Sequence, residues 1–217
     1  MNNTFEEKSA GAVIYNLTTV IQNNKDYLSE IDGATGDGDH GVNMNKGFTM
    51  CRAQLEGNIG DIGLAAAADA LGNTLLSEIG GSMGPLYGTF FIEMGENIYG
   101  KEQLGAGDFL EMLKAGLAGI TSIVPTQLGD KTLLDVLIPS IGAFETALAA
   151  GDDFARALAA LKVAAAASRE ATKDMIAKVG RAATLGERSR GFYDAGATSC
   201  ALILASMADT VLALLEQ

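Results

Sequence analysis

The chain of 217 residues carries 27 acidic side chains against 15 basic ones, which leaves a formal net charge of −12. This charge repels the phosphate backbone of nucleic acids, so nucleic acid is excluded as an expected partner. The length suffices for one sizeable hydrophobic core and no Pro/Ser-rich linker divides the chain, so we expect a single domain over residues 1–217. Cys51 and Cys200 lie in apolar helical patterns, which predicts free thiols rather than a disulfide.

Neither end of the chain predicts a membrane segment. The first residues, MNNTFEEKSAGAV, lack a basic stretch followed by an apolar run. The most apolar stretch, 201–215, is interrupted by Ser206, Asp209 and Thr210. We therefore expect a cytoplasmic protein without a membrane anchor.

Apolar residues recur at helical spacing along almost the whole chain, while sustained alternation of apolar and polar residues is missing, which predicts an all-α fold. The first of eight expected helices starts near Thr4, whose pairing with Glu7 fits a capping box, and runs to about Ser29. The sixth should bend at Pro139, which removes a backbone donor. The other seven helices are expected at about 44–55, 64–79, 85–98, 108–120, 132–149, 153–178 and 196–217.

Short connections make consecutive helices antiparallel neighbours, which predicts an eight-helix up-and-down bundle or barrel. The glycine-rich and charged loops all follow odd-numbered helices of this series. In an up-and-down topology such loops share one end. We therefore expect every chemically suggestive segment to meet at a single rim of the bundle.

The segment 31–48 reads IDGATGDGDHGVNMNKGF and places three carboxylates among glycines. Asp37 and Asp39 are separated by one glycine, which adopts conformations denied to other residues and lets both carboxylates face one point. Together with Asp32 they repel one another unless cations neutralise them, and hard oxygen ligands suit Mg²⁺ shared with substrate phosphates. Two Mg²⁺ ions would balance the three aspartates. The alternative is a solvated acidic turn in which Asp32 forms a local cap.

Familiar nucleotide and calcium motifs do not fit this loop. Gly36, Gly38 and Gly41 spell GxGxxG, but no strand is expected before them, and the aspartates between them would repel a bare pyrophosphate. An EF-hand that started at Asp37 would need glycine and glutamate where this chain has valine and phenylalanine. A Walker A sequence is absent as well, so a nucleotide site would have to be built differently.

Other residues are expected close to the acidic loop. Asn43 is placed to cap the next helix, whose N–H groups would face phosphate oxygens, although an ordinary N-cap explains it equally well. His40 is the only histidine, so a phosphohistidine relay or a Ser-His-Asp triad would have to use it. Beside two aspartates it is better explained as a phosphate contact or as a side chain that supports a metal ligand. The loop 80–85, GGSMGP, lets backbone approach a ligand or forms a tight interhelical turn.

A polar loop at 179–195 carries several cations on an otherwise acidic protein, among them Arg181, Arg188 and Arg190. Such a run is usually a solvated surface. Its expected place at the same rim favours a functional role, because arginine forks bind phosphates and stabilise the charge of phosphoryl transfer.

Four runs in this order, GDGDHGVNMNKGF, GGSMGPLYGTFF, GDKTLLDVLIP and GRAATLGERSRGFYDAGATS, resemble the signature blocks of the L subunit of bacterial dihydroxyacetone kinases. The resemblance implies an eight-helix antiparallel barrel with ADP or ATP bound at one end. It implies that Asp32, Asp37 and Asp39 hold two Mg²⁺ ions that bridge the nucleotide phosphates, with Arg181 and His40 as catalytic candidates. The residues that would surround the nucleotide are His40, Gly41, Val42, Asn43, Ser82, Met83, Leu133, Arg181, Asp194, Ala195 and Gly196.

The chain departs from the family pattern in two places. The phosphate loop GGASGP is GGSMGP here, and the DPG of the last block is DAG at 194–196. Neither change removes an oxygen ligand, but both leave the details of the adenine pocket open.

The family divides its labour among chains. A separate K subunit binds dihydroxyacetone covalently, so an L-like chain should be a phosphotransferase component that is incomplete alone. In the phosphoenolpyruvate-dependent branch, ADP stays bound and is rephosphorylated by an M subunit of the phosphotransferase system; in the other branch, ATP exchanges. A stand-alone L chain favours the first branch.

Two alternatives stay open. One is an ATP-exchanging kinase for another short ketose or, more distantly, for a fatty acid, although the fatty-acid branch has threonine where His40 stands. The other is a nucleotide-loaded module whose main role is to bind a transcription regulator.

Overall fold

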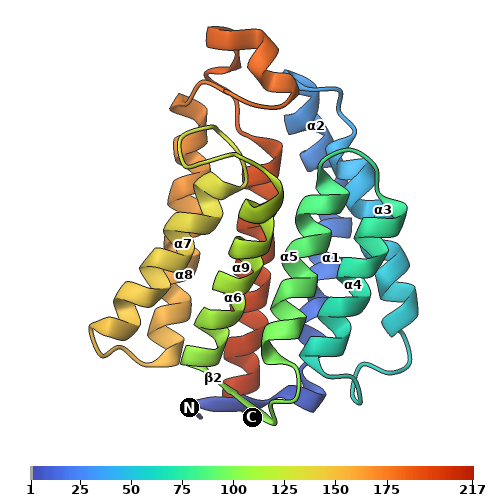
Figure 1. Cartoon of the computed structure of the whole chain (residues 1–217), viewed down its shortest axis with the longest axis vertical. Coiled ribbons are helices and arrows are strands. Elements are labelled where there is room, and N and C mark those ends of the chain that lie inside the picture. The colour runs from blue at the N-terminus through green and yellow to red at the C-terminus, as the bar shows by residue number, and fades with distance from the viewer. Residues whose placement is uncertain (1) are drawn as a thin grey trace.

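In the computed structural model, which describes residues 2–217, nine α-helices form an upright antiparallel bundle (Figure 1). The helices are α1 Ala12–Asn23, α2 Lys25–Thr35, α3 His40–Leu55, α4 Leu64–Glu78, α5 Met83–Ile98, α6 Ala106–Ile123, α7 Leu134–Ala149, α8 Phe154–Ala171 and α9 Ala195–Leu215. Three short 3-10 helices accompany them, η1 Glu7–Ser9, η2 Thr172–Asp174 and η3 Arg181–Ser189. The all-α prediction is confirmed. Nine helices are found instead of the expected eight because α1 and α2 together take the place of the first expected helix.

The helices close into a ring around the core. Each helix from α3 to α9 packs against its neighbour along the chain, and α1 packs against both α3 and α9. Leu204, Met207 and Val211 of α9 are almost completely buried in the resulting core. In the part of the chain that the structure describes, α9 is the one helix long and apolar enough to cross a membrane, but 67% of its most apolar stretch is buried in the bundle. Its place in the core accounts for its composition.

The predicted first helix, from Thr4 to Ser29, is wrong at its start and in its middle. Thr4 belongs to strand β1, Thr4–Glu6, which pairs antiparallel with β2, Gln103–Gly105. Glu7 does not return to Thr4 in a capping box; its side chain instead accepts a hydrogen bond of 2.8 Å from the backbone N–H of Ala65 in α4. The helix is also interrupted at Asn24, whose side-chain amide donates to the carbonyl of Val20 and competes with the backbone.

Two other predicted boundaries shift. The seventh expected helix ends at Ala171 instead of about Lys178, because the chain tightens into η2. Asp108 does not open α6 but lies in its first turn, where its carboxylate accepts a hydrogen bond of 2.9 Å from the N–H of Gly105. Pro139 lies inside α7 as expected.

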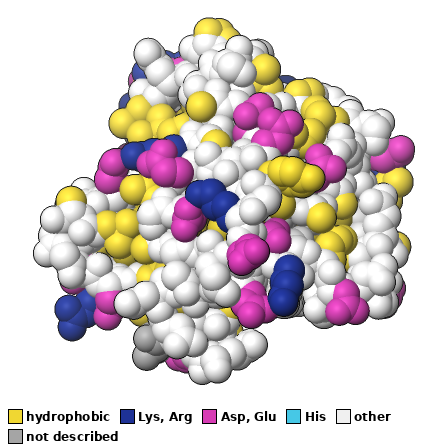
Figure 2. Space-filling view, turned by 60° about the horizontal axis from the view of Figure 1, so that its bottom comes forward, with side chains coloured by type: hydrophobic (Ala, Val, Ile, Leu, Met, Phe, Trp, Pro, Cys, Tyr) yellow, Lys and Arg dark blue, Asp and Glu magenta, His cyan; other side chains and the backbone are white. Residues whose placement is uncertain are grey.

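The four loops that follow α2, α4, α6 and α8 lie at one end of the bundle, the upper end in Figure 1. The two strands and both chain ends lie at the opposite end. That opposite end, brought forward in Figure 2, presents acidic and basic side chains scattered among uncharged ones. The predicted gathering of the chemically suggestive loops at one rim is therefore confirmed.

Glycines allow three neighbouring helices to approach closely. A Cβ added at Gly72 of α4 would lie 2.7 Å from the carbonyl oxygen of Gly88 in α5, and one at Gly116 of α6 would lie 3.0 Å from the carbonyl oxygen of Phe90 in α5. Backbone atoms cannot move aside as a flexible side chain can, so these positions exclude larger residues.

We expect Gly72→Ala to lower the free energy of unfolding by about 1–3 kcal/mol, because the added methyl group overpacks the α4–α5 contact. The matched control is Gly142→Ala on α7, where an added Cβ meets nothing within 4 Å. That change should be neutral or stabilise by up to about 1 kcal/mol, because alanine favours the helix. Urea unfolding of both variants checks the prediction, and equal effects would contradict it.

Candidate functional site

A cavity of about 650 Å³ opens among the four loops at the upper end of the bundle. Each of these loops contributes to its wall, together with the ends of the helices they join. The volume is in the range of pockets that hold small molecules and cofactors. The residues that line the cavity are Asp32, Thr35, Gly36, Asp37, Asp39, His40, Asn43, Gly80, Gly81, Ser82, Met83, Leu86, Tyr87, Ile120, Val124, Pro125, Thr126, Lys131, Thr132, Leu133, Leu134, Val179, Gly180, Arg181, Ala182, Asp194, Ala195 and Gly196.

Three carboxylates converge on one side of this cavity. Asp32 comes from the last turn of α2, and Asp37 and Asp39 come from the loop before α3. One oxygen of each lies within 4.8 Å of the others. Gly38, between the two loop aspartates, has φ +78, a conformation that glycine adopts without strain. The cluster offers oxygen ligands that could hold a divalent cation.

The electrostatics of the cluster favour a bound cation. Partial burial raises the pKa of Asp39, and the neighbouring charges of Asp37 and Asp32 raise it further. Arg181 of η3 partly offsets this repulsion, because its guanidinium donates to Asp37 in a salt bridge. A metal ion would neutralise the same charges more completely and release the arginine to a ligand.

His40, the first residue of α3, is held by two contacts. Its backbone N–H donates to Oδ2 of Asp32 at 3.3 Å, and its ring Nε2 lies 2.9 Å from Oγ of Ser199. Burial lowers the pKa of His40 to about 4, although the charge of Asp32 acts in the opposite direction. The imidazole is therefore neutral at physiological pH and can serve as a hydrogen-bonding group at the cavity wall.

Tyr87 and Ser199 complete a buried network that the sequence did not reveal. The hydroxyl oxygens of Tyr87 and Ser199 lie 2.7 Å apart, and both hydroxyls are within hydrogen-bond distance of the carbonyl oxygen of Gly196. The network joins α5, α9 and the start of α3. In the sequence, the one sign of this network was Ser199, a polar residue on the apolar face of the last helix.

The start of α9 forms another wall. Asp194 is its N-cap, and its carboxylate accepts a hydrogen bond of 2.7 Å from the N–H of Ala197. Burial raises the pKa of Asp194 to about 6, although the bond from Ala197 and the charge of Lys131 act against this shift. Ala195 and Gly196 follow directly on the cavity surface.

The remaining walls are mixed in character. Ser82 is the N-cap residue of α5, and Met83 is the first residue of that helix. Leu133 at the start of α7 adds an apolar surface, which Leu86, Ile120 and Val124 extend. A flat aromatic base fits this apolar side, while the carboxylates and the helix starts suit a metal-bound phosphate chain.

Twelve of the fourteen candidate site residues line the cavity, and Gly41 and Val42 do not. A Cβ added at Gly41 would collide with the carbonyl of Lys25 and lie 2.7 Å from the N–H nitrogen of Ser29, so this glycine lets α3 pack on α2. The side chain of Val42 is exposed. Only their backbone N–H groups, in the first turn of α3, are directed towards the cavity end of the helix.

Asn43 lines the cavity but is not the N-cap of α3, as its sequence position suggested. The N-cap is Asp39, and Asn43 lies in the first turn with its N–H bonded to the carbonyl of Asp39. The helix therefore begins four residues earlier than expected and brings its N–H groups closer to the carboxylates.

A model of the DAK2 domain matches residues 34–209. The chain belongs to the DAK2 domain family. It is 34% identical to the ADP-binding subunit DhaL of the PEP-dependent dihydroxyacetone kinase of Escherichia coli, a match that covers 87% of this chain and 90% of that protein. It is 37% identical to the ADP-binding subunit DhaL of the PTS-dependent kinase of Lactococcus lactis, over 88% of this chain and 91% of the relative. The resemblance to L subunits is thus confirmed.

The DAK2 fold is also found in a larger enzyme. The crystal structure of the dihydroxyacetone kinase of C. freundii in complex with AMP-PNP and Mg²⁺ superposes with a TM-score of 0.71. The two sequences are 24% identical, and the match covers 92% of this chain but 33% of that one. This likeness confirms the fold of the DAK2 domain described here.

We expect the single histidine to give one imidazole signal in NMR that titrates near pH 4 in protein kept metal-free by a chelator. The pKa of His40 in the folded protein lies below the usual value of about 6.5. The contribution of the neutral ring to the free energy of unfolding is therefore fully present above about pH 6.5. That stability is lost as the pH falls towards 4. A titration midpoint at or above 6.5 would contradict the burial of the ring.

Proposed function

We propose that this chain is the nucleotide-binding subunit of a phosphoenolpyruvate-dependent dihydroxyacetone kinase. The observation that carries the proposal is the convergence of three carboxylates and an arginine on one side of a cavity of about 650 Å³. The family supports it, because relatives that match over about nine tenths of their length are named ADP-binding subunits.

The carboxylates of Asp32, Asp37 and Asp39 would hold two Mg²⁺ ions. Two divalent ions offset three carboxylates and leave positive charge for nucleotide phosphates, which is the usual way in which Mg²⁺ joins protein and substrate. When bound, Mg²⁺ neutralises the charge that develops on a transferring phosphoryl group.

The nucleotide, ADP or ATP, would lie across the cavity with its phosphates at the carboxylates and its base on the apolar side. The N–H groups at the start of α3 suit the phosphate oxygens, because the positive end of the helix dipole points there. The proposed nucleotide contacts are His40, Gly41, Val42, Asn43, Ser82, Met83, Leu133, Arg181, Asp194, Ala195 and Gly196.

Two side chains would act on the phosphoryl group. Arg181, which pairs with Asp37 here, would turn to the phosphate and stabilise its charge. His40, kept neutral by burial, would orient a phosphate through a hydrogen bond rather than attack it. No covalent intermediate on this chain is required.

The acceptor would lie on another chain. We propose a K subunit that carries dihydroxyacetone and an M subunit of the phosphotransferase system that rephosphorylates ADP in place. All three chains would meet in the cytoplasm. This chain would contribute positioning and electrostatics at the nucleotide.

We expect Asp37→Asn to weaken Mg-ADP binding by at least about a hundredfold, because it removes a metal ligand, and even groups that merely orient ligands are worth 10–100-fold. Isothermal titration calorimetry measures the binding. Formation of dihydroxyacetone phosphate from phosphoenolpyruvate, after K and M subunits are added, measures the transfer.

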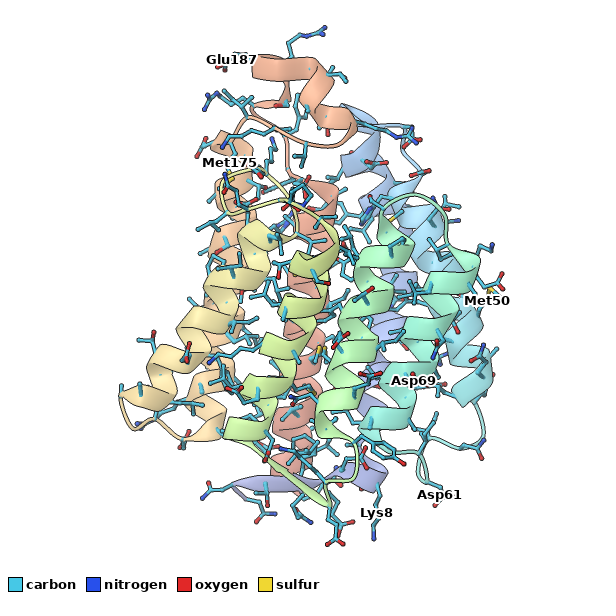
Figure 3. All side chains as sticks on the ribbon, viewed as in Figure 1. Lys8, Met50, Asp61, Asp69, Met175 and Glu187 are labelled. Atoms are coloured by element: carbon cyan, nitrogen blue, oxygen red, sulfur yellow. The ribbon has the colours of Figure 1, made fainter. Side chains whose placement is uncertain are left out.

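The matched control is Asp61→Asn, the same chemical change on an exposed loop at the opposite end (Figure 3). It should leave both measurements unchanged. Tight Mg-ADP binding by Asp37→Asn would refute the metal assignment, and binding without any transfer would refute the kinase assignment.

A further inference from the structure

The segment 175–191, which we call the cap, covers the upper end of the bundle. It leaves η2, forms η3 and leads towards α9, and its labelled residues Met175 and Glu187 mark the upper end in Figure 3. Arg181 is the cap residue that reaches Asp37. The position of the cap therefore decides whether this arginine stands over the carboxylates.

Lys131 lies beneath the cap and joins its two ends. Its ammonium donates to the carbonyl oxygen of Ser189 at 2.5 Å and to that of Met175 at 3.2 Å. The two acceptors are near opposite ends of the cap, so one side chain closes the segment at its base. The residue is 3% exposed.

Keeping a lysine at this position has a cost. A buried ammonium loses its hydration, and burial lowers the pKa of Lys131. The residue also has φ +64, and among residues 2–217 it is the one non-glycine residue in the left-handed region. Such strained residues cluster at functional sites, where the surrounding structure holds them in place.

Neighbouring contacts fasten the same base. The hydroxyl of Ser189 accepts from the N–H of Ala177 at 2.9 Å and donates to the carbonyl of Gly186 at 2.7 Å. The N–H of Lys178 donates to the carbonyl of Asp130, and their side chains form a salt bridge of 3.5 Å. The cap is thus tied to the loop before α7 at several points, with Lys131 at their centre.

Lys131 also lines the cavity, as do Gly180 and Arg181 of the cap. A side chain that contacts both the cap and the cavity can link ligand retention to the position of the cap. Within residues 2–217, both hydrogen bonds of the Lys131 side chain go to backbone carbonyls of the cap, while the carboxylate of Asp194 interacts with it through charge.

We propose that Lys131 is a positioning residue that ties both ends of the cap to the cavity wall, holds Arg181 over the carboxylates and so slows the release of nucleotide. This inference rests on the proposed function, which supplies the nucleotide. It adds the contact that keeps the nucleotide in the cavity.

The test compares Lys131→Met, which keeps the length of the side chain but removes its donors, with Lys8→Met, an exposed lysine at the opposite end (Figure 3). Release of a fluorescent ADP analogue with Mg²⁺ is followed by stopped flow. We expect release to become about tenfold faster or more in Lys131→Met, since two hydrogen bonds of a charged group are lost. Lys8→Met should leave release unchanged.

Two further measurements separate this role from a general loss of stability. Hydrogen exchange should become faster in 175–191 and stay unchanged in the helices of the core. Arg181→Ala should also speed release, and adding Lys131→Met to it should have little further effect, because both act through the same contact. Ser189→Ala, which weakens the same base, gives a second variant if Lys131→Met does not fold.

The proposal would be overturned if neither Lys131→Met nor Ser189→Ala changed nucleotide release or hydrogen exchange. Release rates that multiply in the double variant would also overturn it, because Lys131 would then act independently of Arg181. Hydrogen exchange needs no nucleotide. The wild-type protein could bind no nucleotide while Lys131→Met still speeds hydrogen exchange in 175–191. That result would refute the proposed function but support the contact between Lys131 and the cap.

Discussion

Mutual repulsion among three carboxylates is the constraint on which the site depends. Asp32, Asp37 and Asp39 present oxygens within 4.8 Å of one another, a charge density that needs cations close by. The helical ring fixes Asp32 at the end of α2, and a two-glycine turn brings the loop aspartates to it. Arg181 supplies one positive charge from the cap, and the start of α3 supplies partial charges from its N–H groups.

Much of this arrangement follows from the sequence. An up-and-down order of helices places alternate loops at one end, so the rim was predictable from helix count and loop length alone. The carboxylates were visible because they lie within eight residues of one another. The contacts of His40 with Ser199 and of Tyr87 with Ser199 join positions 159 and 112 residues apart, which no local pattern reveals. Lys131 was missed for the same reason, since its partners belong to the cap.

Two of the errors at helix ends have a common physical origin. A side chain that bonds to a backbone group other than the expected one moves the helix boundary. Glu7 binds the start of α4 instead of forming a capping box with Thr4, and Asn24 bonds to the preceding turn and interrupts the first helix. A third error is of another kind: α3 begins directly after Asp39, without a side-chain cap, instead of after Asn43. The last shift matters for function, because it brings the N–H groups at the start of α3 next to the carboxylates.

We expect Mg²⁺ and an adenine nucleotide to occupy the cavity together. The most direct measurement denatures the purified protein and quantifies the released nucleotide by chromatography and the metal by elemental analysis. We expect close to one ADP and about two Mg²⁺ ions per chain, the number that we propose three carboxylates to share with a phosphate chain. A protein that carries neither, and that also fails to bind added Mg-ADP or Mg-ATP, would show that the cavity is not a nucleotide site.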